Sequence, residues 1–131
     1  MRVYLDTAPV IYLVEAVPNY AEMVDRRVSA ADVIQVASDL TRMECRMKPL
    51  REGNTALLQD YDDYFAEVVA EVVVLSRAVL DRATDIRARY GFKTPDAIHL
   101  AAAIVSGCDV FLTNDHRLDC FPDIPMDVIQ P

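Results

Sequence analysis

The sequence predicts an α/β fold built around a mostly parallel sheet. Short apolar runs typical of buried strands occur at 2–5 (RVYL), 33–37 (VIQVA), 71–75 (EVVVL) and 109–113 (DVFLT), with a last short strand near MDVI at 126–129. Segments with the apolar spacing of helices lie between successive runs. This alternation is typical of strand–helix–strand units, whose strands run parallel in one sheet.

The predicted helices cover residues 8–15, 20–30, 39–48, 55–69, 77–90 and 94–106. The last of them has plain start signals, because Thr94 can cap it, Pro95 suits its first position and Asp96 answers the positive end of the helix dipole. In the segment 55–69 the apolar side chains share one face, namely Leu57, Leu58, Tyr61, Phe65 and Val68. Its acidic residues are therefore expected on a solvated face.

Composition indicates one domain over residues 1–131. Hydrophobic residues make up 53% of the chain, and its 3 Gly and 7 Pro are scattered without any linker-like run or internal repeat. The N-terminal apolar run before Asp6 is too short for a signal peptide, and no apolar run is long enough to span a membrane. We therefore expect a cytoplasmic location.

The net charge of −8 argues against broad, nonspecific attraction to nucleic acid. It leaves room for a local basic rim, since 11 of the 13 basic residues are Arg, which pairs well with phosphate.

The three cysteines, Cys45, Cys108 and Cys120, are odd in number and lack a CxxC pair, so reduced thiols are expected. A zinc site formed by these cysteines with His116 is the alternative.

Two aspartates follow predicted strands directly. Asp6 comes after VYL, and Asp115 lies just past DVFLT. Because parallel strands end at the same edge of a sheet, where such folds place their ligand sites, both carboxylates are expected at one edge. Each of them can also serve simply as a turn or helix cap.

Glu44 lies in the helical segment 39–48. The apolar residues around it predict an inward-facing stripe, which consists of Leu40, Met43, Met47 and Leu50. Glu44 borders this stripe, although a surface pair with Lys48 would also explain it. Since the segment follows a predicted strand, its first turns are expected near the edge that carries Asp6 and Asp115.

If Asp6, Glu44, Asp96 and Asp115 converge, four negative charges would share a partly desolvated pocket. Such crowding raises carboxylate pKa values and disfavours folding unless a cation is present. An oxygen-only, acid-rich site suits Mg²⁺ or Mn²⁺, ions that activate water for phosphodiester hydrolysis.

These residues resemble the four ordered acidic motifs of PIN-domain ribonucleases: LDT after the first strand, Glu44 in LTRMECR, TPDAIHLAAA and LTND. The resemblance covers essentially the whole chain and is closest to the short VapC-type toxins of type II toxin–antitoxin pairs. It implies a three-layer α/β/α domain with about five strands, Mg²⁺-dependent endoribonuclease activity, a homodimer and a cognate VapB-like antitoxin.

The resemblance also implies roles for single residues. Asp6, Asp96 and Asp115 would hold the metal, directly or through water, and Glu44 would orient water or help to bind a second ion. Thr7 and Asn114 are supporting candidates beside these acids. The Arg residues expected to rim the RNA groove are Arg42, Arg46 and Arg117.

Two histidines receive structural assignments. His99 lies on a helix rich in core residues and is expected to be buried and hydrogen bonded, not a general base. His116 is expected to be exposed.

Two other functional classes stay open. One is a phosphoaspartate protein, either a phosphatase or a receiver-like module, in which Asp6 would be phosphorylated; the absence of a second Asp in DTA and the scarcity of Lys weigh against it. The other is a catalytically silent PIN-like scaffold that acts through partner contacts alone.

Overall fold

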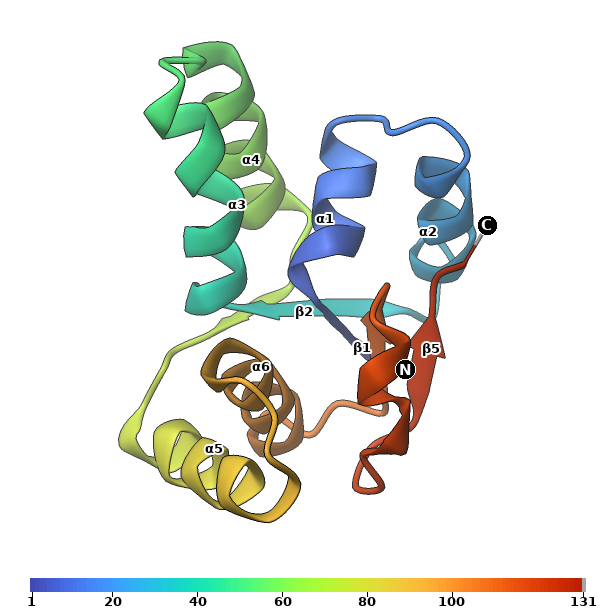
Figure 1. Ribbon diagram of the computed structural model, residues 1–131. Coiled ribbons are helices and arrows are strands. Elements are labelled where there is room, and N and C mark those ends of the chain that lie inside the picture. Colours follow the sequence, from blue (N-terminus) through green and yellow to red (C-terminus); the bar gives the residue numbers. More distant parts are fainter. Residues whose placement is uncertain (131) are drawn as a thin grey trace.

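The fold is a five-stranded parallel sheet between two layers of helices, described by a computed structural model of residues 1–130 (Figure 1). The strands are β1 (Arg2–Leu5), β2 (Ile34–Ser38), β3 (Glu71–Val73), β4 (Val110–Thr113) and β5 (Met126–Val128). They lie in the order β3-β2-β1-β4-β5, and every neighbouring pair is parallel. The predicted α/β/α fold is confirmed.

The helices are α1 (Thr7–Val14), α2 (Tyr20–Val28), α3 (Asp39–Arg51), α4 (Thr55–Glu67), α5 (Arg77–Tyr90) and α6 (Thr94–Val105), with the short 3-10 helix η1 (His116–Cys120) after β4. In Figure 1, α1 to α4 lie on one side of the sheet and α5 and α6 on the other. Each predicted helix occurs, and the one expected at 39–48 runs on to Arg51.

The apolar core is split by the sheet into two clusters. Along β1, Val3 and Leu5 pack with Val10 of α1, whereas Tyr4 between them packs with Leu100 of α6 on the other face. This alternation follows from the two-residue period of a strand. β1 therefore places Tyr4 between the sheet and α6, and Asp6 follows directly at the end of the same strand.

The strand order changes direction at β1. From β1 the chain moves outward to β2 and β3, and it then returns to place β4 on the other side of β1. The carboxyl ends of β1 and β4 thus flank the point at which parallel α/β sheets form their ligand crevices.

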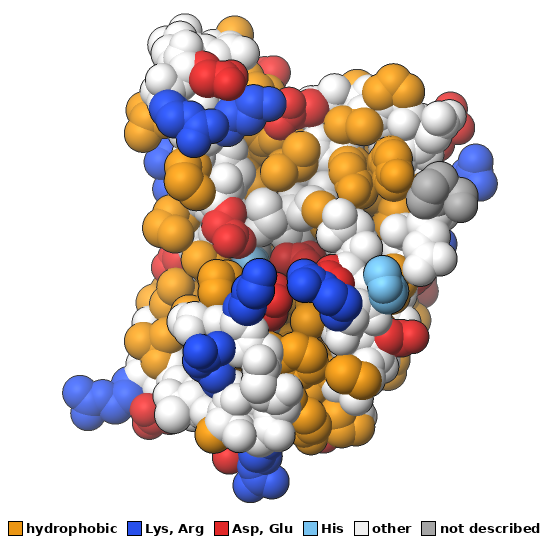
Figure 2. Space-filling model, in the orientation of Figure 1, with side chains coloured by type: hydrophobic (Ala, Val, Ile, Leu, Met, Phe, Trp, Pro, Cys, Tyr) orange, Lys and Arg blue, Asp and Glu red, His pale blue; other side chains and the backbone are white. Residues whose placement is uncertain are grey.

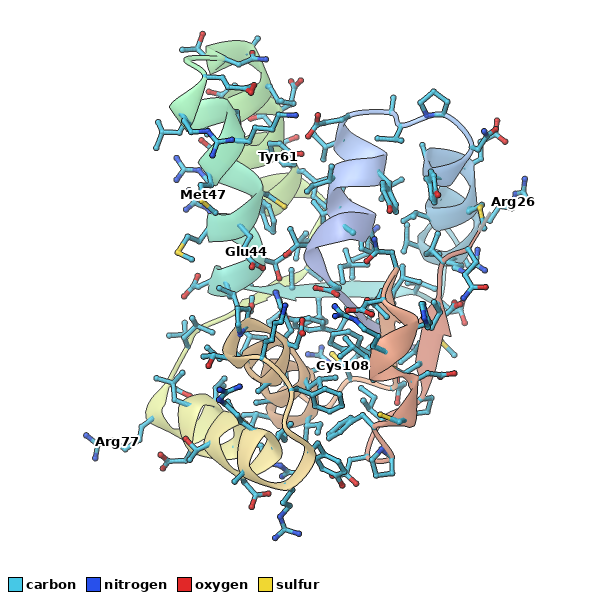
Figure 3. All side chains as sticks on the ribbon, viewed as in Figure 1. Arg26, Glu44, Met47, Tyr61, Arg77 and Cys108 are labelled. Carbon is cyan, nitrogen blue, oxygen red and sulfur yellow. The ribbon has the colours of Figure 1, made fainter. Side chains whose placement is uncertain are left out.

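The predicted apolar stripe of α3 is wrong. Leu40 is buried, but Met43, Met47 and Leu50 are 58%, 54% and 65% exposed. The buried side of α3 consists of Leu40, Thr41, Cys45 and Pro49. The helix projects beyond the sheet beside α4, so within residues 1–130 no element covers its outer side, and the labelled Met47 points outward in Figure 3.

Val68 is a further correction, because it lies past the end of α4 and is 46% exposed. The other apolar residues predicted for that face include Tyr61 and Phe65, and both are buried.

The cysteines are separate free thiols. Cys45 belongs to the core cluster beneath α1, Cys108 packs against the cluster on the opposite face of the sheet, and Cys120 is exposed. The zinc alternative is therefore wrong, since the sheet keeps Cys45 and Cys108 apart.

None of the helices within residues 1–130 combines the length and apolarity that crossing a bilayer requires.

Candidate active site

Asp6 lies where β1 ends and caps the N-terminus of α1. Its Oδ1 accepts a hydrogen bond from the Thr7 backbone N–H, and its Oδ2 accepts one from the Thr113 hydroxyl of β4, each at 2.8 Å. The Asp6 backbone N–H donates to the carbonyl of Leu112 at 2.9 Å. Asp6 thus both follows β1 and caps α1, and its hydrogen bonds to Leu112 and Thr113 connect it to β4.

Asp115 follows β4 and is held beside Asp6 through Thr113. The Asp115 backbone N–H donates to the Thr113 hydroxyl oxygen at 3.0 Å, while that hydroxyl donates to Asp6. The Arg117 guanidinium donates to both Asp115 oxygens. These hydrogen bonds lower the pKa of the Asp115 carboxyl, against the opposing effect of its partial burial.

Asp96 lies in the first turn of α6 and is partly buried. Burial raises the pKa of its carboxyl, and the charges of Asp6 and Asp115 raise it further. Asp96 and Asp115 line a hollow of about 190 Å³ together with Lys93 and Arg117. The structure therefore brings three of the four predicted acids close enough to repel one another.

Glu44, the fourth acid, lies on the side of α3 that faces α1 (Figure 3). Its Oε1 accepts hydrogen bonds from the Thr7 hydroxyl at 2.6 Å and from Nε2 of His99 at 2.7 Å. Burial alone would raise the pKa of Glu44, but these two hydrogen bonds and the proximity of His99 outweigh burial and lower it. Glu44 is thus directed to the acid site and not to Lys48.

His99 connects Glu44 to the core. It is 2% exposed, its Nε2 lies 3.6 Å from Oδ1 of Asp6, and its Nδ1 lies 2.8 Å from the Tyr4 hydroxyl. The expectation of a buried, hydrogen-bonded histidine is confirmed. His116 is exposed, also as expected.

The supporting residues differ in what they contact. Thr7 lies among the acids and donates to Glu44, whereas the Asn114 amide donates to the Tyr12 hydroxyl at 3.0 Å. Sequence reasoning missed Tyr4 and Thr113, because Tyr4 lies inside one apolar strand and Thr113 ends another, so both look like core. The sequence did contain one signal for Thr113: its hydroxyl group directly precedes Asn114 and Asp115.

The three candidate RNA-binding arginines lie in two places. Arg42 and Arg46 both pair with Asp62 of α4, at 3.5 and 2.8 Å, and so join α3 to α4. Arg117 borders the acid hollow with Lys93, which sequence reasoning did not select. Figure 2 shows Lys and Arg side chains beside an acidic surface near the middle of the view.

The donor set fits a hard divalent ion in its chemistry. The carboxylates of Asp6, Asp96 and Asp115 supply oxygen ligands, the kind that Mg²⁺ and Mn²⁺ prefer, and a cation would relieve the repulsion that raises the pKa of Asp96. Within residues 1–130, no three acidic, His or Cys side chains already stand at metal-ligating separations. An ion held by all three carboxylates would therefore require side-chain rearrangement, including release of Asp115 from Arg117.

The PIN domain family model matches residues 3–124 of the chain. No protein with a curated description matches it by sequence.

Several solved structures share the fold. VapBC2 from Rickettsia felis, bound to a DNA fragment from its promoter, is 14% identical with a TM-score of 0.78, covering 99% of this chain and 100% of that one. DNA-bound VapBC from Salmonella typhimurium is 19% identical with a TM-score of 0.72, covering 98% of each chain. VapC20 from Mycobacterium tuberculosis, a toxin that cleaves the sarcin-ricin loop, is 14% identical with a TM-score of 0.69, covering 83% of this chain and 86% of that one.

Proposed function

The chain belongs to the PIN-domain family, and we propose that it is a Mg²⁺-dependent endoribonuclease acting as the toxin of a VapBC-type pair. One observation carries the enzymatic part: Asp96 is partly buried at the ligand edge of the sheet beside Asp6 and Asp115, and its burial, followed by the charges of these two neighbours, raises its pKa. Such repulsion weakens folding unless a cation answers it. The fold shared with VapC20, a toxin that cleaves the sarcin-ricin loop, supports RNA as the substrate class.

Asp6, Asp96 and Asp115 would hold the ion, for which Mn²⁺ is a substitute. When bound, the ion lowers the pKa of water and neutralises charge on the transferring phosphoryl group. Glu44 orients the attacking water, because Thr7 and His99 occupy its Oε1 and leave Oε2 to accept from that water. Asn114 supports the Asp115 turn through its bond to Tyr12.

RNA is a polyanion and the chain carries a net charge of −8, so binding needs a local basic surface. Arg117 borders the acid hollow, and Arg42 and Arg46 lie on α3, the helix that carries Glu44. We assign the phosphate contacts to these three arginines.

A cognate VapB-like antitoxin is the proposed protein partner, since structural neighbours are VapBC complexes. We propose that it inhibits by placing an Arg or Lys among the carboxylates in place of the ion. The Arg117–Asp115 pair supports this, because a guanidinium of the chain itself already donates to both oxygens of one of these carboxylates.

The remaining proposals concern assembly and location. The exposed Met43, Met47 and Leu50 on the outer side of α3 support a homodimer, since contiguous apolar surface of this kind marks association sites. We propose a single domain over residues 1–131 that works in the cytoplasm.

Cleavage of an RNA panel tests the function. The parent should cleave with Mg²⁺ and stop with EDTA, Asp6→Asn should be inactive, and Asp60→Asn on the exposed side of α4 should match the parent. Metal binding without cleavage of any RNA would favour a silent scaffold. A mass increase after treatment with acetyl phosphate, lost in Asp6→Asn, would favour the phosphoaspartate reading.

A further inference from the structure

A buried tyrosine and histidine lie directly behind Glu44. Resting on the proposed function, we propose that Tyr4 and His99 are positioning residues: Tyr4 fixes the His99 ring, and His99 fixes the Glu44 carboxylate for its work on water. Neither residue touches substrate in this proposal. Tyr4 acts on His99, and His99 acts on Glu44.

The contact between His99 and Glu44 sets the position of one hydrogen. Nε2 of His99 lies 2.7 Å from Oε1 of Glu44, and an ionised carboxylate can only accept hydrogen bonds. Nε2 must therefore carry a hydrogen, whether the ring is neutral or protonated. The Thr7 hydroxyl donates to the same oxygen from α1, so donors from two helices hold Oε1. The orientation of the other oxygen, Oε2, is fixed as a result.

Tyr4 closes the other side of the imidazole. Its side chain is 0% exposed, and its ring stacks on Phe111 with centroids 5.2 Å apart and an interplanar angle of 14°. The hydroxyl lies 2.8 Å from Nδ1 of His99 and 2.8 Å from Oγ of Ser38. It has a single hydrogen, so it donates to Nδ1 when the ring is neutral, and donates to Ser38 while accepting from Nδ1 when the ring is protonated.

The surroundings make a purely packing role a poor account of this pair. The neighbours on this face of the sheet are mostly apolar, among them Val36, Leu100 and Phe111. The polar side chains beside the Tyr4 hydroxyl, Ser38 and Thr41, are themselves buried. Burying polar groups there is costly unless each finds a partner, and apolar side chains of similar size would avoid the cost. The chain of contacts from Tyr4 through His99 ends on Glu44, at the acid site.

A Tyr4→Phe substitution tests the proposal with little change in volume. Tyr61→Phe is the matched control, because Tyr61 is also 0% exposed and its hydroxyl is also hydrogen bonded to a side chain, the carboxylate of Glu15. Tyr61 belongs to the core cluster on the opposite face of the sheet from Tyr4. Both variants lose one buried hydroxyl. A packing role predicts similar consequences for the two.

Steady-state cleavage kinetics, measured well below each melting temperature, give the first readout. We expect Tyr4→Phe to lower kcat about 10-fold to 100-fold with KM unchanged, as for other residues that orient a catalytic carboxylate from behind, and Tyr61→Phe to stay within about twofold of the parent. In a His99→Leu background, Tyr4→Phe should have no further effect, since Tyr4 acts through His99. His99→Gln, whose amide can still donate to Glu44, should retain more activity than His99→Leu. Equal effects of the two Tyr→Phe variants, or an undiminished effect of Tyr4→Phe in His99→Leu, would overturn the proposal.

A second readout needs no RNA cleavage. Nitrogen-15 NMR of the His99 ring should show a hydrogen on Nε2 that exchanges slowly with water in the parent and in Tyr61→Phe, and faster in Tyr4→Phe. A ring with hydrogen on Nδ1 alone would refute the arrangement. The two measurements test the two proposals separately. A parent that cleaves no RNA contradicts the proposed ribonuclease function, and the position of the ring hydrogen decides whether His99 holds Glu44.

Discussion

The Arg117 guanidinium donates hydrogen bonds to both oxygens of the Asp115 carboxylate, with Nη2 2.6 Å from Oδ2. A residue proposed to bind metal is therefore already engaged by a cation of the same chain. Because the Arg117 side chain is 66% exposed, solvent screens the pair and keeps its contribution to stability small.

Arg117→Gln should consequently raise Mn²⁺ affinity by at most about fivefold, since Asp115 no longer has to leave a partner. The same substitution should weaken RNA binding, because a phosphate contact is lost. Calorimetry with Mn²⁺ alone and RNA titration of the metal-free protein separate the two effects. A variant in which both affinities fall would show that Arg117 orders the site instead of competing for it.

Asp96→Asn should abolish cleavage, with a loss of more than about 100-fold, and should stabilise the metal-free fold at neutral pH. The folded-state pKa of Asp96 is raised by burial and by Asp6 and Asp115, so the folded chain binds this proton more readily than the unfolded chain. The contribution of Asp96 to stability is therefore present below its ordinary pKa of about 3.9 and is lost as the pH rises through the folded value.

Melting curves at several pH values, without metal, check this sign. The variant should melt above the parent at pH 7, and the difference should shrink as the pH approaches about 3. Added Mn²⁺ should then raise the melting temperature of the parent and not that of the variant. A variant that melts lower at pH 7 would mean that Asp96 is chiefly a helix cap.

Neutralising the proposed RNA-binding arginines should flatten the dependence of RNA affinity on salt. Each lost phosphate contact should reduce the slope of log affinity against log salt by about 0.7. Arg42 and Arg46 must exchange Asp62 for phosphate, so Asp62→Asn should strengthen RNA binding. Arg89→Gln is the control, since Arg89 pairs with Asp85 on the exposed side of α5. If the salt dependence of RNA affinity were the same for Arg46→Gln and Arg89→Gln, α3 would not be part of the RNA-binding surface.

Antitoxin and metal should compete for the acid cluster. At constant ionic strength, raising Mg²⁺ should weaken binding of the antitoxin, measured by calorimetry, and Asp6→Asn combined with Asp115→Asn should remove most of that sensitivity. An affinity indifferent to Mg²⁺ and to both substitutions would place inhibition at the RNA surface instead.

The sequence by itself determined the layer architecture and the edge that carries the acids. Apolar runs such as RVYL and DVFLT are local signals, and because parallel strands end at one edge, Asp6 and Asp115 had to lie at the same edge of the sheet. Only the structure showed that β1 and β4 are neighbours, which places the two aspartates side by side. The start of α6 is signalled locally too, by Pro95, which is why Asp96 was placed in its first turn. The predicted cap is wrong, because Thr94 already lies inside the helix and the N-cap is Lys93, which makes no side-chain cap hydrogen bond.

The tertiary structure alone decided which faces are covered and what the polar core residues contact. Met43, Met47 and Leu50 have the spacing of a buried stripe, yet burial depends on a neighbouring element, and α3 extends past the sheet. Tyr4 reads as core in RVYL and His99 as an isolated polar residue in TPDAIHLAAA. Their 2.8 Å contact joins residues 95 positions apart, and no local pattern encodes such a contact because it exists only after β1 and α6 have packed.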